Sequence, residues 1–324
     1  MMRIRRRPLL GAAAALLAAP AVRAQQGWPN RPVRIVVPSP TGAFDVYARM
    51  MAPRLSELWG QPVVVDNRPG ANGNIGMAEV QRAPPDGHTI LFAAVGSLSI
   101  NISIYRSMPL DPIEDLAPVA LSVTSPMVWV ANPQTTLHSL RDVITQARAA
   151  PGRLPYALPS SGTINHLIVE AFKQRHGLDM PAVPYRGTAA AQIDVIAGQV
   201  PLMVDSLGAG YGNISAGRVR ALALTSRGRA ERVPDLPSAI ELGLEDREYV
   251  AWYAYMAPKA TPSAVLARLN AGINEVAMGA EVAERLHGMG SAPAAMTPEA
   301  QLAFMRSERS LWGGIARAAN VEVQ

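Results

Sequence analysis

The chain has 324 residues, with 30 Lys and Arg against 25 Asp and Glu and a formal net charge of +5. It contains no cysteine, which excludes disulfides, thiol nucleophiles and thiolate metal sites. Hydrophobic residues make up 49% but aromatic residues only 5%, so a chain long enough for two domains should have mainly aliphatic cores.

The first residues have the pattern of an export signal. A basic stretch at 3–7 precedes an apolar run at 9–19, which is too short to cross a bilayer, and small residues follow at 22–24. We therefore expect a cleavable signal peptide at 1–24 and a periplasmic mature protein. Pro20 interrupts the apolar run and argues against a retained anchor. Arg6 and Arg7 also fit a twin-arginine signal, so Sec and twin-arginine export both stay open.

Removal of this signal changes what the charge implies. Residues 1–24 contain five arginines and no acid, so 25 basic and 25 acidic residues remain and the mature chain is formally neutral. The sequence pI of about 9.8 is then partly a property of the signal and is poor evidence for a nucleic-acid partner. We expect no nucleic-acid partner, no metal and no cofactor.

Strand and helix patterns alternate along the mature chain. Strands are expected at 33–37, 62–65, 89–93, 127–130, 156, 182–185, 202–204 and 219–225. Helices are expected at 45–58, 75–82, 140–149, 165–175, 189–197, 265–278, 281–286 and 298–319. Asp45 is the expected N-cap of the first helix. This order predicts an α/β fold with parallel sheets covered by helices, and turn residues cluster near 119–126 and 237–250, where the chain is expected to cross between lobes.

The stretch VVVDNRPGANGNIG (63–76) ends a strand in a loop rich in Gly and Asn. Its glycine spacing is G-x-x-G-x-x-G, which matches neither dinucleotide-binding nor phosphate-loop motifs. We expect a rigid loop in which Arg68 pairs with Asp66 or with neighbouring carbonyls. The alternative is a contact to a ligand or to a membrane partner.

Two strand ends that run into helices are candidate anion sites. TGAF (41–44) precedes the first helix, and SSGT (160–163) precedes the helix that carries His166. Ligands of open α/β sheets bind at such ends, where unpaired backbone N–H groups and the helix dipole favour negative charge. Two such loops facing each other would hold a carboxylate without an arginine.

After the segment 31–76, further motifs follow in order along the mature chain: APPDGHTILF (83–92), GTINHL (162–167), VPYRG (183–187), IDVIAGQV (193–200) and GRVRALA (217–223). Together they cover essentially the whole mature chain and resemble the Bug family, the extracytoplasmic solute receptors of tripartite tricarboxylate transporters, with 31–76 similar to the family's opening. Two loops depart from the usual pattern. PSPTGAFD (38–45) is one residue short and has Ala43 in place of a glycine, and YALPSSGT (156–163) has Leu158 and Pro159 in place of small residues.

The resemblance implies a type II, Venus-flytrap periplasmic binding protein with two lobes, each a mainly parallel sheet flanked by helices. The implied lobes are 25–124 with 249–324, and 125–248. It implies a monomer that closes on a small organic carboxylate and docks on the membrane subunits of a tripartite tricarboxylate transporter. The expected ligand-binding residues are Ser39, Thr41, Gly42, Ala43, Asp45, Ser97, Ser160, Ser161, Gly162, Thr163, His166, Tyr185, Arg186, Gly187, Thr188 and Asp205.

Several of these residues also have a purely structural interpretation. The hydroxyls at 160–163 and Thr188 are suited to capping helices, and a lone histidine such as His166 is commonly a satisfied structural residue. A buried Asp205 would accept loop amides rather than bind an anion, although it would also suit an ammonium group.

An enzyme is the rival class of function. Ser97 lacks a G-x-S-x-G context, the five histidines show no metal-binding spacing, and Ser161 and His166 are five residues apart, a poor fit for one helix face. We therefore expect no catalysis. A receptor that signals to a sensor kinase, rather than one that feeds a transporter, stays open.

Overall fold

The computed structural model describes residues 27–39 and 43–323, and the expected signal peptide lies outside them. Within these ranges, no helix combines the length and apolar composition needed to cross a membrane. The strands are β1 (Val33–Val37), β2 (Val63–Asn67), β3 (Thr89–Ala94), β4 (Leu116–Ala131), β5 (Tyr156–Leu158), β6 (Ala182–Pro184), β7 (Leu202–Ser206), β8 (Arg220–Leu224), β9 (Val250–Pro258) and β10 (Ala292–Pro293).

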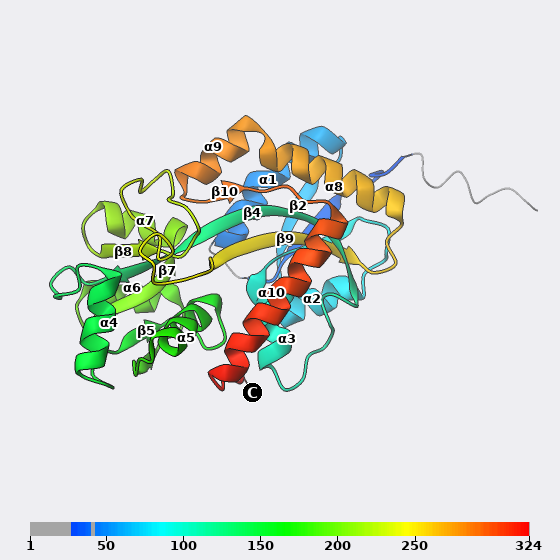
Figure 1. Ribbon diagram of the computed structural model, residues 1–324. Helices are drawn as coiled ribbons and strands as arrows, with labels where there is room; N and C mark the ends of the chain where they lie inside the picture. The colour runs from blue at the N-terminus through cyan, green and yellow to red at the C-terminus, as the bar shows by residue number, and fades with distance from the viewer. Residues whose placement is uncertain (1–26, 40–42, 324) are drawn as a thin grey trace, which may run out of the picture.

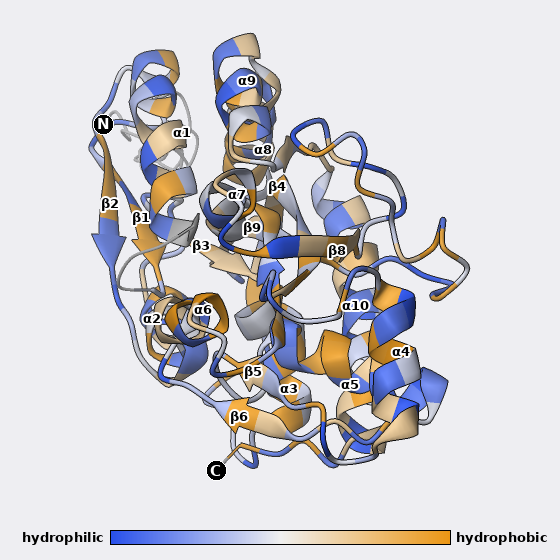
Figure 2. Cartoon of the chain, turned by 90° about the vertical axis from the view of Figure 1, so that its left-hand side faces the viewer, coloured by the Kyte–Doolittle hydropathy of each residue, from blue (hydrophilic) through white to orange (hydrophobic). Residues whose placement is uncertain are grey.

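The helices lie on both sides of these strands (Figure 1). They are α1 (Ala43–Trp59), α2 (Asn74–Gln81), α3 (Asn101–Ile104), α4 (Leu140–Ala149), α5 (Ile164–His176), α6 (Thr188–Ile196), α7 (Leu207–Ser215), α8 (Ser263–Met278), α9 (Ala280–Gly288) and α10 (Pro298–Ala318). A 3₁₀ turn (Ala71–Gly73) leads into α2, and a π-helical turn (Gly96–Ile100) leads into α3. The helices carry both polar and apolar residues, as elements with one buried face do (Figure 2).

All strands belong to one mixed sheet in the order β2-β1-β3-β9-β4-β7-β5-β6, with β8 and β10 also paired to β4. The outer strands are parallel, as expected: β1 pairs with β2 and β3, and β5 pairs with β6 and β7. The central strands are antiparallel, because β9 runs between β3 and β4, and β4 runs against β7. The parallel pattern predicted from sequence therefore holds only away from the centre.

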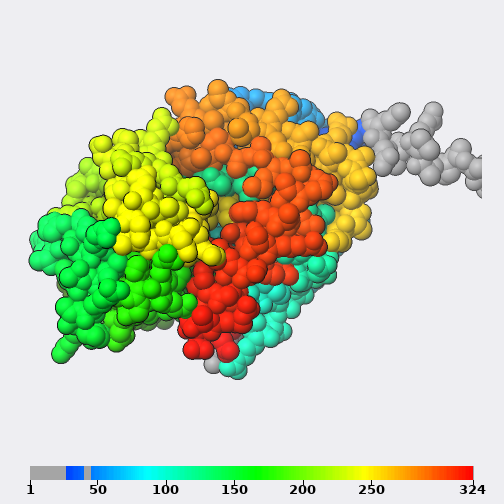
Figure 3. All heavy atoms as spheres, viewed as in Figure 1, coloured from blue at the N-terminus to red at the C-terminus, as the bar shows by residue number. Residues whose placement is uncertain are grey.

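Strand β4 belongs to both halves of the molecule. Its residues from Leu116 to Pro126 pair with β9, and its residues from Met127 to Ala131 pair with β7. We call the elements on the β9 side the first lobe and those on the β7 side the second lobe. The segment 119–126, where turn residues cluster in the sequence, is therefore strand. Figure 3 shows the second lobe at the left, in green and yellow, against the orange and red helices of the first.

Buried apolar residues cover both faces of β4 in the second lobe. Trp129 packs on Phe172 of α5, with ring centroids 4.9 Å apart, and belongs to the larger buried cluster. Its neighbours Val128 and Val130 point to the opposite face and belong to a second buried cluster. A strand buried on both faces has no polar alternation. The same property explains why β9, with eight of its nine residues buried, was not predicted.

Helix α10 is attached to β9 by a shared carboxylate. Oε2 of Glu308 accepts hydrogen bonds from the indole N–H of Trp252 at 2.7 Å and of Trp312 at 2.8 Å. Burial raises the pKa of Glu308 above its ordinary value, and the two indole donors oppose that rise. The last helix of the chain is thus fixed to a central strand of the sheet.

The lobes also touch at the start of α7. A Cβ at Gly208 would lie 2.8 Å from the carbonyl oxygen of Met289, so only glycine allows this approach. Beside it, the hydroxyl of Tyr47 lies 2.6 Å from Ser291 Oγ, which is 3.2 Å from Ser125 Oγ on β4. A buried hydroxyl chain therefore joins α1 to the strand that both lobes share.

Two capping predictions are wrong. Helix α1 begins at Ala43, so Asp45 lies inside its first turn, where an acid still favours the helix dipole but does not cap. Helix α6 begins at Thr188 with Gly187 at the N-cap position, so Thr188 is inside the helix as well. The unpredicted elements are β9, β10, α7, the 3₁₀ turn at 71–73 and the helical turns at 96–104.

The loop between β2 and α2 is held by ion pairs and close contacts. Arg68 donates to Asp66 at 3.1 Å, which confirms the predicted pair, and Arg34 also donates to Asp66, at 2.9 Å. A Cβ at Gly76 would lie 2.9 Å from Pro38 Cβ and 3.0 Å from the carbonyl oxygen of Arg68. The glycine therefore lets α2 approach the end of β1.

We expect Gly76→Ala to destabilise the protein by about 1 kcal/mol or more, because overpacking against Pro38 outweighs the gain in helix propensity. The matched control is Gly212→Ala in α7, where a Cβ would meet no atom within 4 Å. That control should be neutral or slightly stabilising. Urea unfolding measures both, and equal midpoints for the two variants would contradict the close contact.

Candidate functional site

The first group of predicted residues is organised by Asn67. Its side-chain amide donates to the carbonyl oxygen of Ser39 at 2.9 Å and to Asp45 Oδ1 at 3.0 Å. Arg49 donates to Asp45 at 2.8 Å and to Asn67 Oδ1 at 2.9 Å. These bonds, that from Arg49 foremost, hold the pKa of Asp45 below its ordinary value. Asp45 thus fixes the loop, and Arg49 compensates its charge.

Three further predicted residues of this loop are Thr41, Gly42 and Ala43. Thr41 and Gly42 lie outside the described residues, and Ala43 begins α1.

Ser97 lies under the glycine-rich loop. Its side chain is buried and its hydroxyl donates to the carbonyl oxygen of Ala94 at 3.3 Å. A Cβ at Gly73 would lie 3.1 Å from Ser97 Cβ, so the loop rests directly on this serine. The structure therefore gives Ser97 a contact to the loop that the sequence did not indicate.

The second group lies where β5 runs into α5. Thr163 stands at the N-cap position of α5, but its hydroxyl donates to the carbonyl oxygen of Ser160 at 2.9 Å and caps no amide. The side chain of Ser161 is exposed. The N–H of Gly162 donates to Nδ1 of His166 at 3.2 Å. The hydroxyl-capping interpretation is thus wrong for Thr163, and no side chain caps the first-turn amides of α5.

Gly162 is also where this second-lobe loop meets the first lobe. Its φ is +72°, in the left-handed region that favours glycine. A Cβ there would overlap Cδ1 of Ile104, at the end of α3, and would lie 3.2 Å from Cγ2 of Val323. The loop that carries Ser161 is therefore placed against the other lobe by a residue without a side chain.

The turn from β6 into α6 is bonded to the β5 loop. The N–H of Tyr185 donates to the carbonyl oxygen of Leu158, and the N–H of Gly187 to that of Pro159, both at 2.8 Å. The Tyr185 hydroxyl donates to Asp194 at 2.8 Å, and partial burial with this carboxylate raises the pKa of Tyr185 to about 12. Arg186 is exposed. The amide of Gly187 is thus engaged by Pro159, one of the two residues that depart from the family pattern.

Asp205 ends β7 as a buried carboxylate. It accepts from the side-chain amide of Gln192 at 2.6 Å and from the N–H of Ser206 at 2.8 Å. Burial raises its pKa to about 6. The interpretation that a buried acid here accepts a loop amide is confirmed, and both oxygens have donors.

Hydrogen bonds join the second-lobe candidates into one surface. The Asn165 side chain donates to the carbonyl oxygen of Val204 at 2.8 Å, which ties the start of α5 to β7. Together with the Pro159–Gly187 bond and the Gln192–Asp205 bond, it brings three strand ends next to one another. Sequence reasoning missed Asn165 and Gln192, because a single amide side chain in a helix carries no distinctive pattern.

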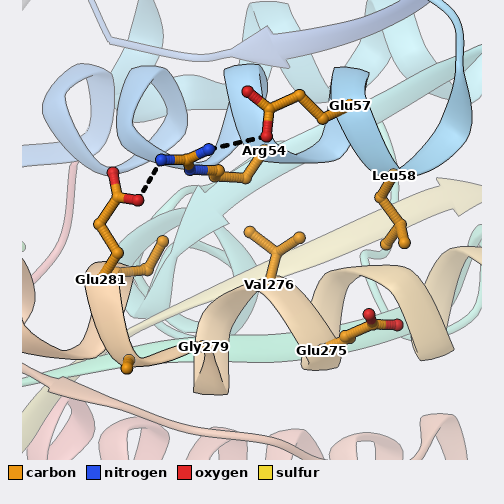
Figure 4. A pocket seen from close by; sticks show the side chains of 9 residues that line it. Arg54, Glu57, Leu58, Glu275, Val276, Gly279 and Glu281 are labelled. Carbon is orange, nitrogen blue, oxygen red and sulfur yellow. Dashed lines mark hydrogen bonds and ion pairs between the residues drawn. The ribbon is translucent and has the colours of Figure 1, made fainter.

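A surface hollow of about 500 Å³ lies elsewhere, between α1 and α8–α9 (Figure 4). Arg54 within it already pairs with Glu57 at 2.7 Å and with Glu281. Glu275 adds a further negative charge to its lining. Such a lining repels carboxylates, so we do not assign the ligand site to this hollow.

The geometry at His166 does not suit a serine hydrolase. The acceptor nitrogen of its ring is used by the N–H of Gly162, whereas a general base would need it for the nucleophile's proton. In the part of the chain that the structure describes, no group of three or more His, Asp or Glu could hold a metal ion.

The sequence profile of the tripartite tricarboxylate transporter family receptor matches residues 47–321. Protein BugT of Bordetella pertussis is 35% identical over 299 residues, which cover 92% of this chain and 92% of BugT. The structure of R. palustris Rpa4515 with adipate has a TM-score of 0.83 at 33% identity, covering 91% of this chain and 99% of that chain. MatC from Rhodopseudomonas palustris with bound malate has a TM-score of 0.78 at 27% identity, covering 89% and 99%.

We expect the stability difference between the wild type and Asp205→Asn to depend on pH. The folded pKa of about 6 lies above the ordinary value of 3.8, so the folded state binds more protons between these values. Wild-type stability should therefore fall as pH rises from about 4 to 6, by up to about 3 kcal/mol from this group. The variant should lack this loss. Urea unfolding at several pH values tests this, with the exposed Asp235→Asn as control, and parallel profiles for wild type and Asp205→Asn would contradict it.

Proposed function

Because the chain belongs to the tripartite tricarboxylate transporter family of receptors, we propose that it captures a small organic carboxylate between its lobes and delivers it to that transporter's membrane subunits. Receptors of this family are periplasmic solute-binding proteins. Two similar proteins were solved with adipate and with malate, which are both dicarboxylates. We propose a dicarboxylate as the ligand here.

The observation that carries this proposal is the start of α5. No side chain caps its first-turn amides, and Ser161, two residues before the N-cap Thr163, is exposed. Backbone N–H groups at a helix N-terminus attract an anion, and the exposed hydroxyl adds a donor. The neighbouring α6 presents a second N-terminus without a side-chain cap. A carboxylate would be held there without any buried arginine, and bridging waters would complete its contacts.

The proposed ligand-binding residues belong to strand ends or to the segments that follow strands in the sequence, in both lobes. In the second lobe they are Ser160, Ser161, Gly162, Thr163, His166, Tyr185, Arg186, Gly187, Thr188 and Asp205. In the first lobe they are Ser39, Thr41, Gly42, Ala43, Asp45 and Ser97. The bonds described above suggest that Asp45, Ser97, Gly187 and Asp205 act mainly by shaping the loops, whereas Ser161 is the side chain best placed to contact a ligand.

We propose that binding closes the lobes. A ligand that bridges them stabilises the closed state by its differential contacts, and the closed form then docks on the membrane subunits. We propose a monomer whose lobes comprise 25–124 with 249–324, and 125–248. The shared strand β4 and its neighbour β9 would form the hinge.

A ligand screen tests the class of function. Mature protein with adipate at 100 times its Kd should gain about 2.7 kcal/mol of stability. This would raise Tm by on the order of 5 °C. Malate and other dicarboxylates belong in the same panel, and the matching diamides serve as neutral controls. A shift with the diamide equal to that with the acid, or no shift across the panel, would argue against a carboxylate receptor.

Ser161→Ala should weaken dicarboxylate binding roughly tenfold or more, because a hydrogen bond to a charged group contributes about 1.5–3 kcal/mol. Its unfolding free energy should not change, since the side chain is exposed. Ser215→Ala, at an exposed serine of the same lobe, is the matched control. Isothermal titration calorimetry measures both variants. Equal affinities for the two would remove Ser161 from the site.

A further inference from the structure

His166 makes a contact that depends on its protonation state. The N–H of Gly162 points at its Nδ1, at 3.2 Å, and a donor needs a lone pair to accept its hydrogen. The imidazole must therefore be neutral, with its proton on Nε2. That nitrogen faces Glu170 Oε1 at 3.8 Å, one turn further along α5. The ring is thus placed between a backbone donor and a carboxylate.

Glu170 is hydrogen-bonded to groups other than the His166 ring. Its Oε1 accepts from Lys173 Nζ at 2.7 Å and from the hydroxyl of Tyr156, on β5, at 3.1 Å. Burial lowers the pKa of His166; Glu170 opposes this shift and Lys173 adds to it. The first-lobe residues against the loop, Ile104 and Val323, are apolar.

The nearest charges on those first-lobe segments are Arg106 and Glu322, which pair with each other at 3.4 Å. They are largely exposed, so solvent screens them. Glu170 and Lys173 on α5 are the charged groups whose fields act on the ring, and Tyr156 on β5 is bonded to the same Glu170.

We propose that His166 is a positioning residue that holds the 160–163 loop in its binding geometry only while the imidazole is neutral, so that dicarboxylate affinity falls in acid. This inference rests on the proposed function for its ligand. Protonation would place an N–H on Nδ1 against the N–H of Gly162, so two donors would face each other. Gly162 has little room to adjust, because it lies against Ile104 and Val323. The loop would then have to leave its place beside α5.

The sign of the effect follows from this contact. Above the pKa of His166, which lies below the usual 6.5, the ring accepts the Gly162 N–H and affinity is constant. Below that pKa, affinity should fall by up to about tenfold per pH unit, because the binding-competent loop requires release of one proton. A merely structural histidine would leave the pH dependence of binding unchanged.

The test measures the Kd of adipate from pH 8 down to pH 4 for wild type, His166→Gln and the control His138→Gln, whose side chain is exposed. The glutamine carbonyl can accept the Gly162 N–H but does not titrate. Below the midpoint of the His166 ring, we expect affinity to fall by up to about tenfold per pH unit for wild type and the control, and to fall less for His166→Gln. Comparison between variants removes the titration of adipate itself. Identical pH profiles for all three would overturn the proposal.

A second measurement does not depend on the ligand. NMR of the wild-type protein should show the His166 proton on Nε2 at neutral pH, and the Gly162 amide resonance should shift with the same midpoint as the His166 ring. A proton on Nδ1 at neutral pH, or a Gly162 resonance that does not follow the ring, would overturn the inference. If adipate does not bind but both NMR results hold, the proposed ligand fails while the role of His166 stands.

Discussion

The structure depends above all on one constraint, which is that strand β4 serves both lobes. Its first part pairs with β9 and its last part with β7, so one strand sets the position of its neighbours on both sides. Both faces of its final residues are buried, with Trp129 on one side and Val128 on the other. The strand ends near the proposed site are positioned by their pairing with this strand, either directly or through neighbouring strands. Motion between the lobes must then bend or twist β4 and β9 rather than a flexible linker.

The proposed site consists of backbone and side-chain groups that are mostly hydrogen-bonded to one another. The carbonyl oxygen of Pro159 accepts from the N–H of Gly187. Asp205 accepts from Gln192 and Ser206, and His166 accepts from the N–H of Gly162. Engaged groups of this kind fix the loops in advance, which lowers the entropy that a ligand must remove on binding. In the proposed site, the start of α5 and Ser161 remain for a ligand. Such a site would recognise the charge of a ligand more strongly than its carbon skeleton.

Much of the fold followed from sequence pattern, because strands such as β1 and helices such as α4 are bounded by turn residues and have clear periodicity. The two-lobe organisation was predicted from the resemblance to the family. Strand β9 was not predicted because burial on both faces removes the polar alternation. The chain does pass from the β9 side to the β7 side next to 119–126, but it does so within the continuous strand β4 rather than through a turn. In the site, the loop residues were visible as motifs. The amide side chains of Asn165 and Gln192 that fix them were not, since their roles depend on contacts distant in sequence.

The place of β9 has a consequence for how the protein is made. Strand β9 lies between β3 and β4 in space, but in the chain it follows the whole second lobe. Helix α10, whose Glu308 accepts a hydrogen bond from Trp252 of β9, comes even later in the chain. During synthesis from the N-terminus, the first lobe therefore cannot complete its sheet until the second has emerged. The lobe that begins the chain is the last to be finished, and until then its central strands have open edges that must be kept from pairing elsewhere.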